Sequence, residues 1–536
     1  MGERRLTRRE ALRAASASAV GAWLLAGCGA DAGTLGALPG STLELRLGDP
    51  GRNGILRAIP GLPLIDRTDL AAARSRGTVL ATLAQLSDLH VHDAQSPARV
   101  PFLDRLGPRF GSAFRPHETL VPAVLAGALG AINRAGPDAV IVSGDLLDSA
   151  QQNELDWALA LLSGATVRPD SGGAGYEGVQ SPSNPDPAYY RPGVDPPRHA
   201  GLLRRALGPV RVPRLRAPWY PVLGNHDVLV QGAVGPSDAT RATATGERLV
   251  VSPDAALLAL GRSGRLSRGA IDGLLRRGLP GRAISVTPDR ARAHLDAAGT
   301  VRRMRAAGAA SQHAGGDNAR LDHAFEVGER LLVIVLDVVR RDQGAGGLVT
   351  AATVSFLRDA LDAAGERWVI VCTHQPLAGA ENAVAALALL DRDPRVVAVL
   401  AGHTHRNDVT PRRSATGGYW LITTCSLIDW PQQWRMLRLI ETAGGGIALE
   451  AWMVDHPGRP NDPADLAGIA RDLAYLDVQG GRPAGAGGPR NAQNVRLHLP
   501  SRRPRAPTGP TGPAAAPAPS PAPAPAGAGL GDTLTP

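Results

Sequence analysis

The chain has 536 residues, and its 58 basic residues, all of them arginine, exceed its 49 acidic residues by nine. Aromatic residues make up only 4% of the chain, and the arginines are dispersed rather than gathered in a stripe interleaved with aromatic side chains. Such a distribution is typical of a solvated surface, so the excess of positive charge does not predict a nucleic-acid partner.

The beginning of the chain has the features of an export signal, which we assign to residues 1–27. The paired arginines Arg8 and Arg9 precede an apolar stretch at residues 14–26. This stretch of 13 residues is too short to cross a bilayer as a helix. The arginine pair resembles a twin-arginine signal, which exports folded proteins, although Ala11 stands where Phe is usual.

A lipidation site follows the apolar stretch. The sequence Leu-Ala-Gly-Cys that ends at Cys28 resembles a bacterial lipobox, in which the cysteine is acylated and becomes the mature N-terminus. We therefore expect an exported lipoprotein, held at the extracytoplasmic face of a bacterial membrane by the lipid on Cys28. The alternative is a secreted protein in which Cys28 is incidental. Cys372 and Cys425 lie in apolar runs and predict buried free thiols, with a disulfide between them as the alternative.

Strand-like and helical patterns alternate along the rest of the chain. Apolar, β-branched runs predict buried strands at 82–86, 139–143, 219–223, 331–337, 368–372 and 396–401. Helical spacing predicts helices at 118–133, 154–162, 353–364, 383–390 and 465–476. This alternation predicts a layered α/β sandwich. Three further strand-like runs, at 419–428, 435–440 and 447–454, are expected to complete a second sheet.

Five short polar blocks follow five of the predicted strands. They are Ser-Asp-Leu-His at 87–90, Gly-Asp-Leu-Leu-Asp at 144–148, Gly-Asn-His-Asp at 224–227, Thr-His-Gln-Pro at 373–376 and Gly-His-Thr-His at 402–405. Open α/β sheets place their sites in such loops, at the carboxyl ends of strands. The mixture of Asp, Asn and His suits Mn, Fe, Zn or Co better than Ca or Mg. One block alone is better explained by a turn or by a core or surface histidine, but five together predict a metal-dependent enzyme.

The blocks resemble the motifs of the calcineurin-like metallophosphoesterase superfamily. That superfamily has D-x-H, G-D-x-x-D, G-N-H-D/E, a single His and G-H-x-H in this order, and the resemblance covers about residues 81–454. It implies a four-layer α/β/β/α sandwich with two mixed sheets and the hydrolysis of phosphate esters at two adjacent metal ions. The alternative is a non-catalytic, metal-binding envelope lipoprotein.

The resemblance also implies which residues hold the metal ions. The expected ligands are Asp88, His90 and His405 for one ion, and Asn225, His374 and His403 for the other. Asp145 is expected to bridge the two, because a carboxylate shares its oxygens between cations whereas an imidazole ligates through one nitrogen at a time. Two such ions polarise a phosphoryl group and lower the pKa of a bridging water, so that hydroxide becomes available as the nucleophile.

Two further residues of the blocks are expected to be catalytic. The resemblance pairs His226, which follows Asn225, with Asp148, three positions after Asp145. His226 would protonate the leaving group, and the Asp148 carboxylate would orient the His226 ring. Because Asp148 stands where purple acid phosphatases carry a Tyr ligand, an iron–tyrosinate site is not expected.

Arg115 is a weaker candidate, for binding a phosphate oxygen, and a surface arginine is its alternative interpretation. His92, Asp93, Asp337 and Arg406 are candidates for orienting the ligands rather than for catalysis. The expected substrate is a small phosphate ester or a phospholipid head group. The blocks specify neither a monoester nor a diester, and the sequence does not specify the oligomeric state.

The positions of the blocks require one domain to enclose all of them. The expected parts are the signal (1–27), a tether and N-terminal extension (28–80), the main domain (81–455) with insertions (168–213 and 228–327), a C-terminal extension (456–499) and a tail (500–536). The first insertion predicts a long loop, and the second contains short helical patterns at 255–260, 270–279 and 289–307. The tail is rich in Pro and Ala and lacks apolar periodicity, so we expect it to be disordered.

Overall fold

The computed structural model describes residues 38–263, 267–309, 311, 313–315 and 318–501. The predicted export signal, the predicted lipidation site at Cys28 and nearly all of the predicted tail lie outside the described residues. Within the described ranges, no helix is both long enough and apolar enough to cross a membrane.

Two seven-stranded sheets are the largest sheets of the described residues. The first sheet has the order β3 (Ile65–Arg67), β18 (Val495–Leu499), β17 (Gly446–Asp455), β16 (Gln433–Thr442), β4 (Arg76–Leu86), β5 (Ala139–Val142) and β6 (Trp219–Pro221). The second has the order β14 (Asp408–Arg412), β15 (Tyr419–Thr423), β13 (Val396–Ala401), β12 (Trp368–Cys372), β11 (Leu331–Val335), β10 (His323–Val327) and β9 (His313–Ala314). Each sheet combines parallel pairs, such as β4 with β5 and β12 with β13, with antiparallel ones, so both sheets are mixed.

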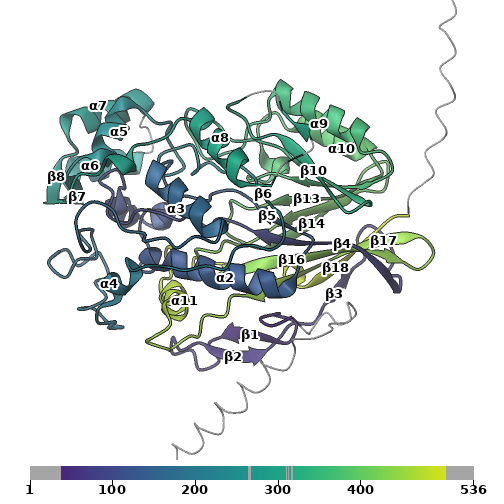
Figure 1. Ribbon diagram of the computed structural model, residues 1–536, viewed down its shortest axis with the longest axis horizontal. Coiled ribbons are helices and arrows are strands. Elements are labelled where there is room, and N and C mark those ends of the chain that lie inside the picture. Colours follow the sequence, from purple (N-terminus) through teal and green to yellow (C-terminus); the bar gives the residue numbers. More distant parts are fainter. Residues whose placement is uncertain (1–37, 264–266, 310, 312, 316–317, 502–536) are drawn as a thin grey trace, which may run out of the picture. The chain divides into compact units, whose positions relative to one another are not determined.

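The two sheets pack against each other, and helices cover both outer faces (Figure 1). An apolar core between the sheets joins residues of both, such as Leu83 on β4 and Leu400 on β13. The first sheet is covered by α2 (Val121–Ala135), α3 (Gln152–Leu162), α8 (Ala297–Ala307) and α11 (Leu466–Leu476), and the second by α9 (Ala351–Ala363) and α10 (Val384–Arg392). The predicted four-layer α/β/β/α sandwich with two mixed sheets is therefore confirmed.

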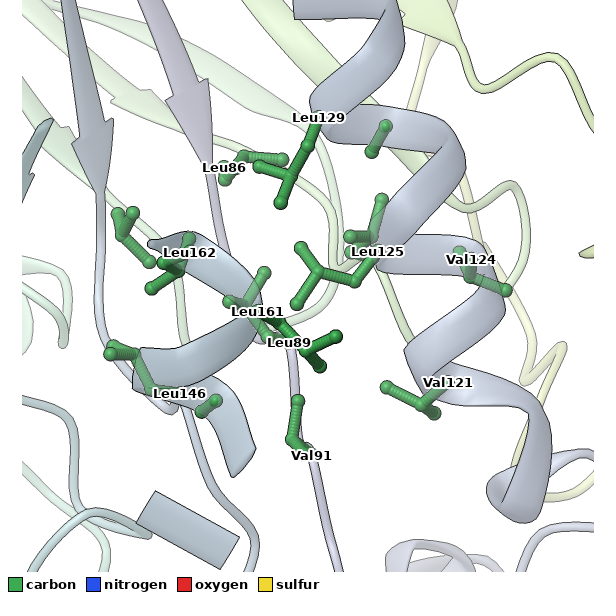
Figure 2. Close-up of a cluster of buried hydrophobic side chains, with 14 of the residues drawn as sticks. Leu86, Leu89, Val91, Val121, Val124, Leu125, Leu129, Leu146, Leu161 and Leu162 are labelled. Atoms are coloured by element: carbon green, nitrogen blue, oxygen red, sulfur yellow. The ribbon is translucent and has the colours of Figure 1, made fainter. Parts of the chain in front are cut away.

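Helix α2 shows how the sequence pattern produces this packing. Its apolar residues recur at helical spacing and are buried; they are Val121, Val124, Leu125, Ala128, Leu129 and Ile132. Pro122 fits the first turn, where helix N–H groups lack partners, and Gly136, with a φ of 59°, ends the helix. Leu125 packs in one cluster with Leu161 of α3 and Leu86 of β4 (Figure 2). Truncation of such a leucine to alanine costs about 2–5 kcal/mol.

The remaining elements belong to the N-terminal extension, the insertions and the connecting loops. A hairpin of β1 (Leu45–Gly48) and β2 (Arg57–Pro60) precedes the first sheet. The first insertion is mostly loop, with the short helix α4 (Leu202–Ala206). The second holds α5 (Asp238–Thr245), α6 (Ala255–Ser263), α7 (Arg268–Arg277) and a two-stranded sheet of β7 (Arg248–Pro253) and β8 (Gly281–Ser285). Short 3₁₀ helices are η1 (Pro101–Leu106), η2 (Pro108–Ala113), η3 (Glu118–Leu120), η4 (Arg290–Arg292), η5 (Leu377–Gly379) and η6 (Arg490–Ala492).

The expectation that the last three strand-like runs form a second sheet is wrong. β15 joins the second sheet beside β13, whereas β16 and β17 join the first sheet beside β4. Strand pairing is a long-range choice that the pattern within a strand does not specify. β3 and β18 lie outside 81–455 and also belong to the first sheet. Cys372 and Cys425 are buried and free, in agreement with the preferred interpretation.

Candidate metal centre

The five polar blocks meet where the carboxyl ends of strands from both sheets come together. The first sheet supplies Asp88 and His90 after β4, Asp145 after β5 and Asn225 after β6, and the second supplies His374 after β12 and His403 and His405 after β13. Their ligand-type atoms form three overlapping clusters, each with its atoms within 4.8 Å of one another: Asp88, His90 and His405; His90, Asp145 and His226; Asp145, His374 and His403. The fold thus brings the expected ligands together.

The first cluster matches the set expected for one metal ion. Nε2 of His405 lies 3.2 Å from Asp88 Oδ1 and 3.3 Å from Nε2 of His90. The Asp88 carboxylate is fully buried, and the backbone N–H of His403 donates to it. The hydroxyl of Ser87 donates to Asp88 as well. Asp88 is thus fixed with its Oδ1 directed at the His405 imidazole.

The third cluster, together with Asn225, matches the set expected for the other ion. Nε2 of His374 lies 3.0 Å from Asp145 Oδ2, and Nδ1 of His403 lies 3.1 Å from Asn225 Oδ1. The Asn225 side chain is oriented by donating from Nδ2 to the carbonyl of Gly232 at 2.9 Å. Its carbonyl oxygen is thereby directed toward His403.

Asp145 lies between the first and the third of these clusters. Its Oδ2 is 3.0 Å from His374 Nε2 and 3.7 Å from His90 Nε2, while its Oδ1 accepts the backbone N–H of His226 at 2.8 Å. One oxygen of this carboxylate therefore faces a histidine of each cluster. This is the position in which a shared ligand would lie.

The donor atoms fit metal ions because their hydrogen bonding is incomplete. Nδ1 of His90 lies 3.0 Å from Asp148, and Nδ1 of His405 lies 2.5 Å from Asp429, so both N–H groups are committed to carboxylates. In the neutral tautomers the two Nε2 atoms, 3.3 Å apart, then face each other with lone pairs. The Nε2 of His374 is buried and makes no hydrogen bond of regular geometry with the described residues, although Asp145 Oδ2 lies 3.0 Å from it. A cation between these atoms resolves both deficits.

The electrostatics of the cluster also favour cations. Burial and a neighbouring imidazole lower the pKa of His90 and of His403 to about 4, which leaves both rings neutral. Burial opposes ionisation of Asp88, but His405 and His374 outweigh it and lower its pKa to about 2. Burial likewise lowers the pKa of His405, yet Asp88 and Asp429 raise it to about 10. In the absence of a metal ion, the buried carboxylates thus draw protons onto the imidazoles that a metal would otherwise occupy.

Five of the expected ligands have left-handed backbone conformations. The φ angles are 52° for Asp88, 48° for His90, 51° for Asp145, 69° for His403 and 54° for His405. Residues other than glycine rarely adopt this conformation, and each instance costs of order 1–3 kcal/mol. The surrounding structure holds these residues in place. A Cβ at Gly144 would collide with the His374 ring, and one at Gly224 with the Asp145 carboxylate.

The sequence did not identify every carboxylate that forms a hydrogen bond with an expected ligand. Asp429 holds His405, and Arg115 binds Asp429 through two hydrogen bonds of 2.5 and 3.0 Å. The Arg115 side chain is only 3% exposed, so its alternative interpretation as a surface arginine is wrong, and its contact with a phosphate oxygen stays a prediction. In the described structure Arg115 neutralises the carboxylate that orients an expected ligand.

The pairing of Asp148 also differs from the expected one. Its carboxylate lies 3.0 Å from Nδ1 of His90 but 3.8 Å from Nδ1 of His226. His226 instead contacts the backbone carbonyl of Asp148 through Nδ1 at 2.5 Å. The Asp148 side chain is further held by Nε2 of Gln231 at 2.7 Å and by the nearby guanidinium of Arg99. The carboxylate thus orients the expected metal ligand His90, whereas a main-chain group orients His226.

His226 lies at the edge of the cluster. Its ring packs edge-on against His90, with centroids 4.6 Å apart, and its side chain is 13% exposed. Because a carbonyl oxygen can only accept, Nδ1 carries the hydrogen that is donated to Asp148, and Nε2 is the ring nitrogen left to gain or release a proton. Gly232, with a φ of 65°, packs against that edge of the ring, where a Cβ would collide with it.

Asp227, the last residue of its block, was not identified from the sequence as important. It is fully buried and accepts backbone N–H groups of Gly224, Asp145, Leu146 and Leu147 at 2.7–3.3 Å. Burial, followed by the charge of Asp145, raises the pKa of Asp227 to about 8. Asp227 ties two of the ligand loops together.

The remaining weak candidates are placed as follows. His92 contacts the carbonyl of His90 through Nδ1 at 2.8 Å and so supports a ligand segment. Asp93 pairs with Arg292 at 3.0 Å, and Asp337 accepts backbone N–H groups of loop residues such as Leu321. Arg406 is exposed. None of these last three has a contact with an expected ligand in the described hydrogen bonds and ion pairs.

No protein-family model matches the chain, and no curated protein matches it. Among solved structures, the chain is similar to a dimetal phosphatase from Danio rerio, with 12% identity and a TM-score of 0.34 over 71% of this chain and 100% of that chain. It is also similar to a structure of PhoD, with 12% identity and a TM-score of 0.31 over 78% of this chain and 80% of that chain. Likeness at this level does not transfer an activity.

Proposed function

We propose that the protein is a metal-dependent phosphoesterase of the calcineurin-like type, with two metal ions at the centre described above. The observation that supports this most strongly is the pair of imidazoles of His90 and His405, which face each other through Nε2 at 3.3 Å while carboxylates hold their Nδ1 atoms. Carboxylate–histidine pairs of this kind orient imidazoles toward metal ions.

Each ion would be held by residues of both sheets. The proposed ligands are Asp88, His90 and His405 for one ion and Asn225, His374 and His403 for the other, with Asp145 shared. Bound Mn, Fe, Zn or Co ions would polarise the phosphoryl group and lower the pKa of a water molecule. The ligand set does not distinguish among these four metals.

His226 would act as the general acid. Its Nδ1 is held by the Asp148 carbonyl at 2.5 Å, which fixes the ring and leaves Nε2 to carry the transferred proton. As an imidazolium it would donate that proton to the leaving alkoxide. The 13% exposure of its side chain lets the ring regain a proton from solvent after each turnover.

The substrate would be a phosphate monoester or diester, either a small molecule or a phospholipid head group. Purified protein should be assayed with an aryl phosphate and with the corresponding bis-aryl diester, after loading with Mn, Fe, Zn or Co. We expect hydrolysis of at least one ester that is lost on chelation and restored by metal. Absence of turnover with every metal would favour the alternative of a non-catalytic metal-binding protein.

Metal stoichiometry tests the two-ion arrangement independently of turnover. Elemental analysis should find two ions per chain, because one first-row ion does not accept all seven proposed ligands. Asp145→Asn should lose more metal than Asn225→Ala, because only Asp145 faces both clusters. A stoichiometry that stays at one ion under saturating metal would exclude the two-ion mechanism.

We also propose that the protein is exported and anchored to the bacterial membrane by a lipid on Cys28. The support is the Leu-Ala-Gly-Cys sequence after the apolar signal segment. Cys28→Ser should move the protein from the membrane fraction to the soluble fraction, because acyl chains supply the anchoring apolar area. Retention of this variant in the membrane would contradict the lipobox assignment.

A further inference from the structure

A groove of about 640 Å³ lies away from the metal centre, between the β1–β2 hairpin and the segment that follows β17. None of the proposed metal ligands lines it. Five arginines do, against the two acidic residues Glu44 and Asp455, which gives a formal charge of 5 − 2 = +3; they are Arg46, Arg57, Arg134, Arg459 and Arg471. The groove therefore attracts anions.

The arginines differ in whether their charge is already compensated. Arg471 is 1% exposed and donates to the carbonyls of His456 and Gly458, but its Nε has no partner among the described residues. Arg459 pairs with Asp462 at 2.7 Å. In contrast, Arg46, Arg57 and Arg134 make no hydrogen bond or ion pair with an acidic side chain in the described structure. Three positive charges at this groove are thus available to a ligand.

Apolar side chains accompany these charges. Of the large apolar residues exposed on the described structure, Leu45 is 58% exposed on β1, Ile55 is 40% exposed in the hairpin loop and Leu476 is 42% exposed at the end of α11. The hairpin and α11 touch, because a Cβ on Gly54 would lie 2.9 Å from Leu476 Cδ2. Figure 1 shows β1, β2 and α11 on the same side of the first sheet. Exposed apolar residues beside unpaired arginines are typical of surfaces that lie on anionic lipid.

The position of the groove along the chain agrees with this interpretation. Pro39, the second described residue, lines the groove, and Leu38 lies only ten positions after Cys28 in the sequence. An acyl chain on Cys28 would hold the groove within the reach of ten residues, at most about 36 Å, of the membrane.

We propose that the groove docks the protein onto the anionic phospholipid surface to which its N-terminus is tethered, with lipid phosphates bound by Arg46, Arg57 and Arg134. The tethering rests on the proposed lipidation, but the groove itself does not, because its arginines and apolar rim are present in the unlipidated chain. Docking would fix one orientation of the domain on the membrane.

The test uses the full chain carrying Cys28→Ser, so that no lipid is attached. A cysteine at Glu44→Cys, within the groove, is labelled with an environment-sensitive fluorophore, and Asp359→Cys on the exposed side of α9 is the control position. On addition of phosphatidylglycerol vesicles, we expect a blue shift from the groove label and none from the control label. No shift from the groove label would overturn the proposal, whatever the signal segment itself does.

Charge variants test the arginines. Arg46→Gln, Arg57→Gln and Arg134→Gln together should weaken the blue-shift titration with phosphatidylglycerol by about a hundredfold, since each basic residue near an anionic surface contributes about fivefold. A matched triple of exposed arginines, Arg211→Gln, Arg358→Gln and Arg392→Gln, removes the same charge elsewhere and should leave the titration nearly unchanged. Equal losses in both triples would overturn the role of the groove.

The source of the phosphate is tested by competition. Glycerol 3-phosphate at millimolar concentration should not displace the vesicles, and phosphatidylcholine vesicles should give no shift. Displacement by glycerol 3-phosphate, or a shift with that compound alone, would replace the lipid-surface proposal by a site for soluble phosphate esters. Metal content and ester hydrolysis should be unaffected by the groove variants, so failure here is distinguishable from failure of the proposed function.

Discussion

The carboxylate of Asp148 forms a hydrogen bond with His90, at 3.0 Å between Oδ1 and Nδ1. This contact makes Asp148 a positioning residue for a proposed metal ligand. The position of an aspartate within its motif therefore does not decide which histidine it serves, because both histidines lie within 4 Å of it.

Asp148→Asn should weaken metal binding by about 10- to 100-fold, the usual effect of removing a carboxylate behind a histidine ligand. Metal affinity can be measured by competition with a chromophoric chelator, and turnover should recover at saturating metal. Asp391→Asn is a suitable control, because Asp391 pairs with Arg412 away from the centre. Unchanged metal affinity combined with a large loss of turnover would instead assign Asp148 to the acid His226.

His226→Ala should retain both metals and lose about 10²- to 10⁴-fold in turnover, the usual contribution of a positioned general acid. The loss should be smaller for an aryl ester than for an alkyl ester, because an alcohol of low pKa departs without protonation. Parallel rates and elemental analysis for the two substrates check this. Equal losses for both esters would rule out the acid role, and loss of one metal would identify His226 as a ligand, consistent with its cluster with His90 and Asp145.

Arg115→Ala should destabilise the protein by about 3–5 kcal/mol, because it leaves Asp429 buried without its counter-ion. Urea denaturation measures this loss. KM for the metal-loaded variant should stay within a few-fold of wild type, since the Arg115 guanidinium is engaged by the Asp429 carboxylate. A tenfold rise in KM with unchanged stability would support the predicted substrate-binding role. Arg367→Ala, which breaks a partly exposed pair with Glu326, should cost far less.

Asp322 provides a pH dependence of stability. Burial, followed by the charge of Asp337, raises its pKa in the folded protein to about 6, above an unfolded value of about 3.9. Protonated Asp322 therefore makes its full contribution to the stability of the fold below about pH 3.9, and this contribution is lost as the pH rises through 6. The Asp322→Asn variant lacks this pH-dependent loss. Its free energy of unfolding, relative to that of wild type, should therefore rise by about 3 kcal/mol between pH 4 and pH 7.

Urea denaturation of both proteins across that pH range provides the measurement. Asp391→Asn is the control of opposite sign, because Arg412 lowers the pKa of Asp391 and its stabilisation is lost as the pH falls. If the difference in free energy of unfolding between wild type and Asp322→Asn did not change with pH, Asp322 would already be ionised at acid pH.

The strands and motifs could be predicted because their signal is local. Residues 368–372 and 396–401 are continuous apolar runs, and the observed strands β12 and β13 have those bounds. The partners of a strand are not a local property. Leu437 of β16 lies opposite Leu83 of β4 across a separation of more than 350 residues, and no pattern within 435–440 encodes that choice.

The residues that orient the expected ligands were harder to predict, because their role depends on which loops come together in the folded chain. Asp429 belongs to none of the five blocks, although it directly follows the strand-like run at 419–428. The same rule that identified the blocks, a polar residue at the end of such a run, would have identified it. Arg115 carried no comparable signal, because burial beside Asp429 arises only in the folded chain.

Each proposed ion takes ligands from both halves of the sandwich: Asp88 and His90 face His405, and Asp145 and Asn225 face His374 and His403. Metal binding would thus link the two sheets at one edge, while the apolar contact of residues such as Leu83 and Leu400 holds the sheets together elsewhere. In the apoprotein, the apolar contact would hold the two layers together without this link. Its ligand loops should exchange amide hydrogens faster than its core strands, and loading with metal should join the two layers into one cooperative unit.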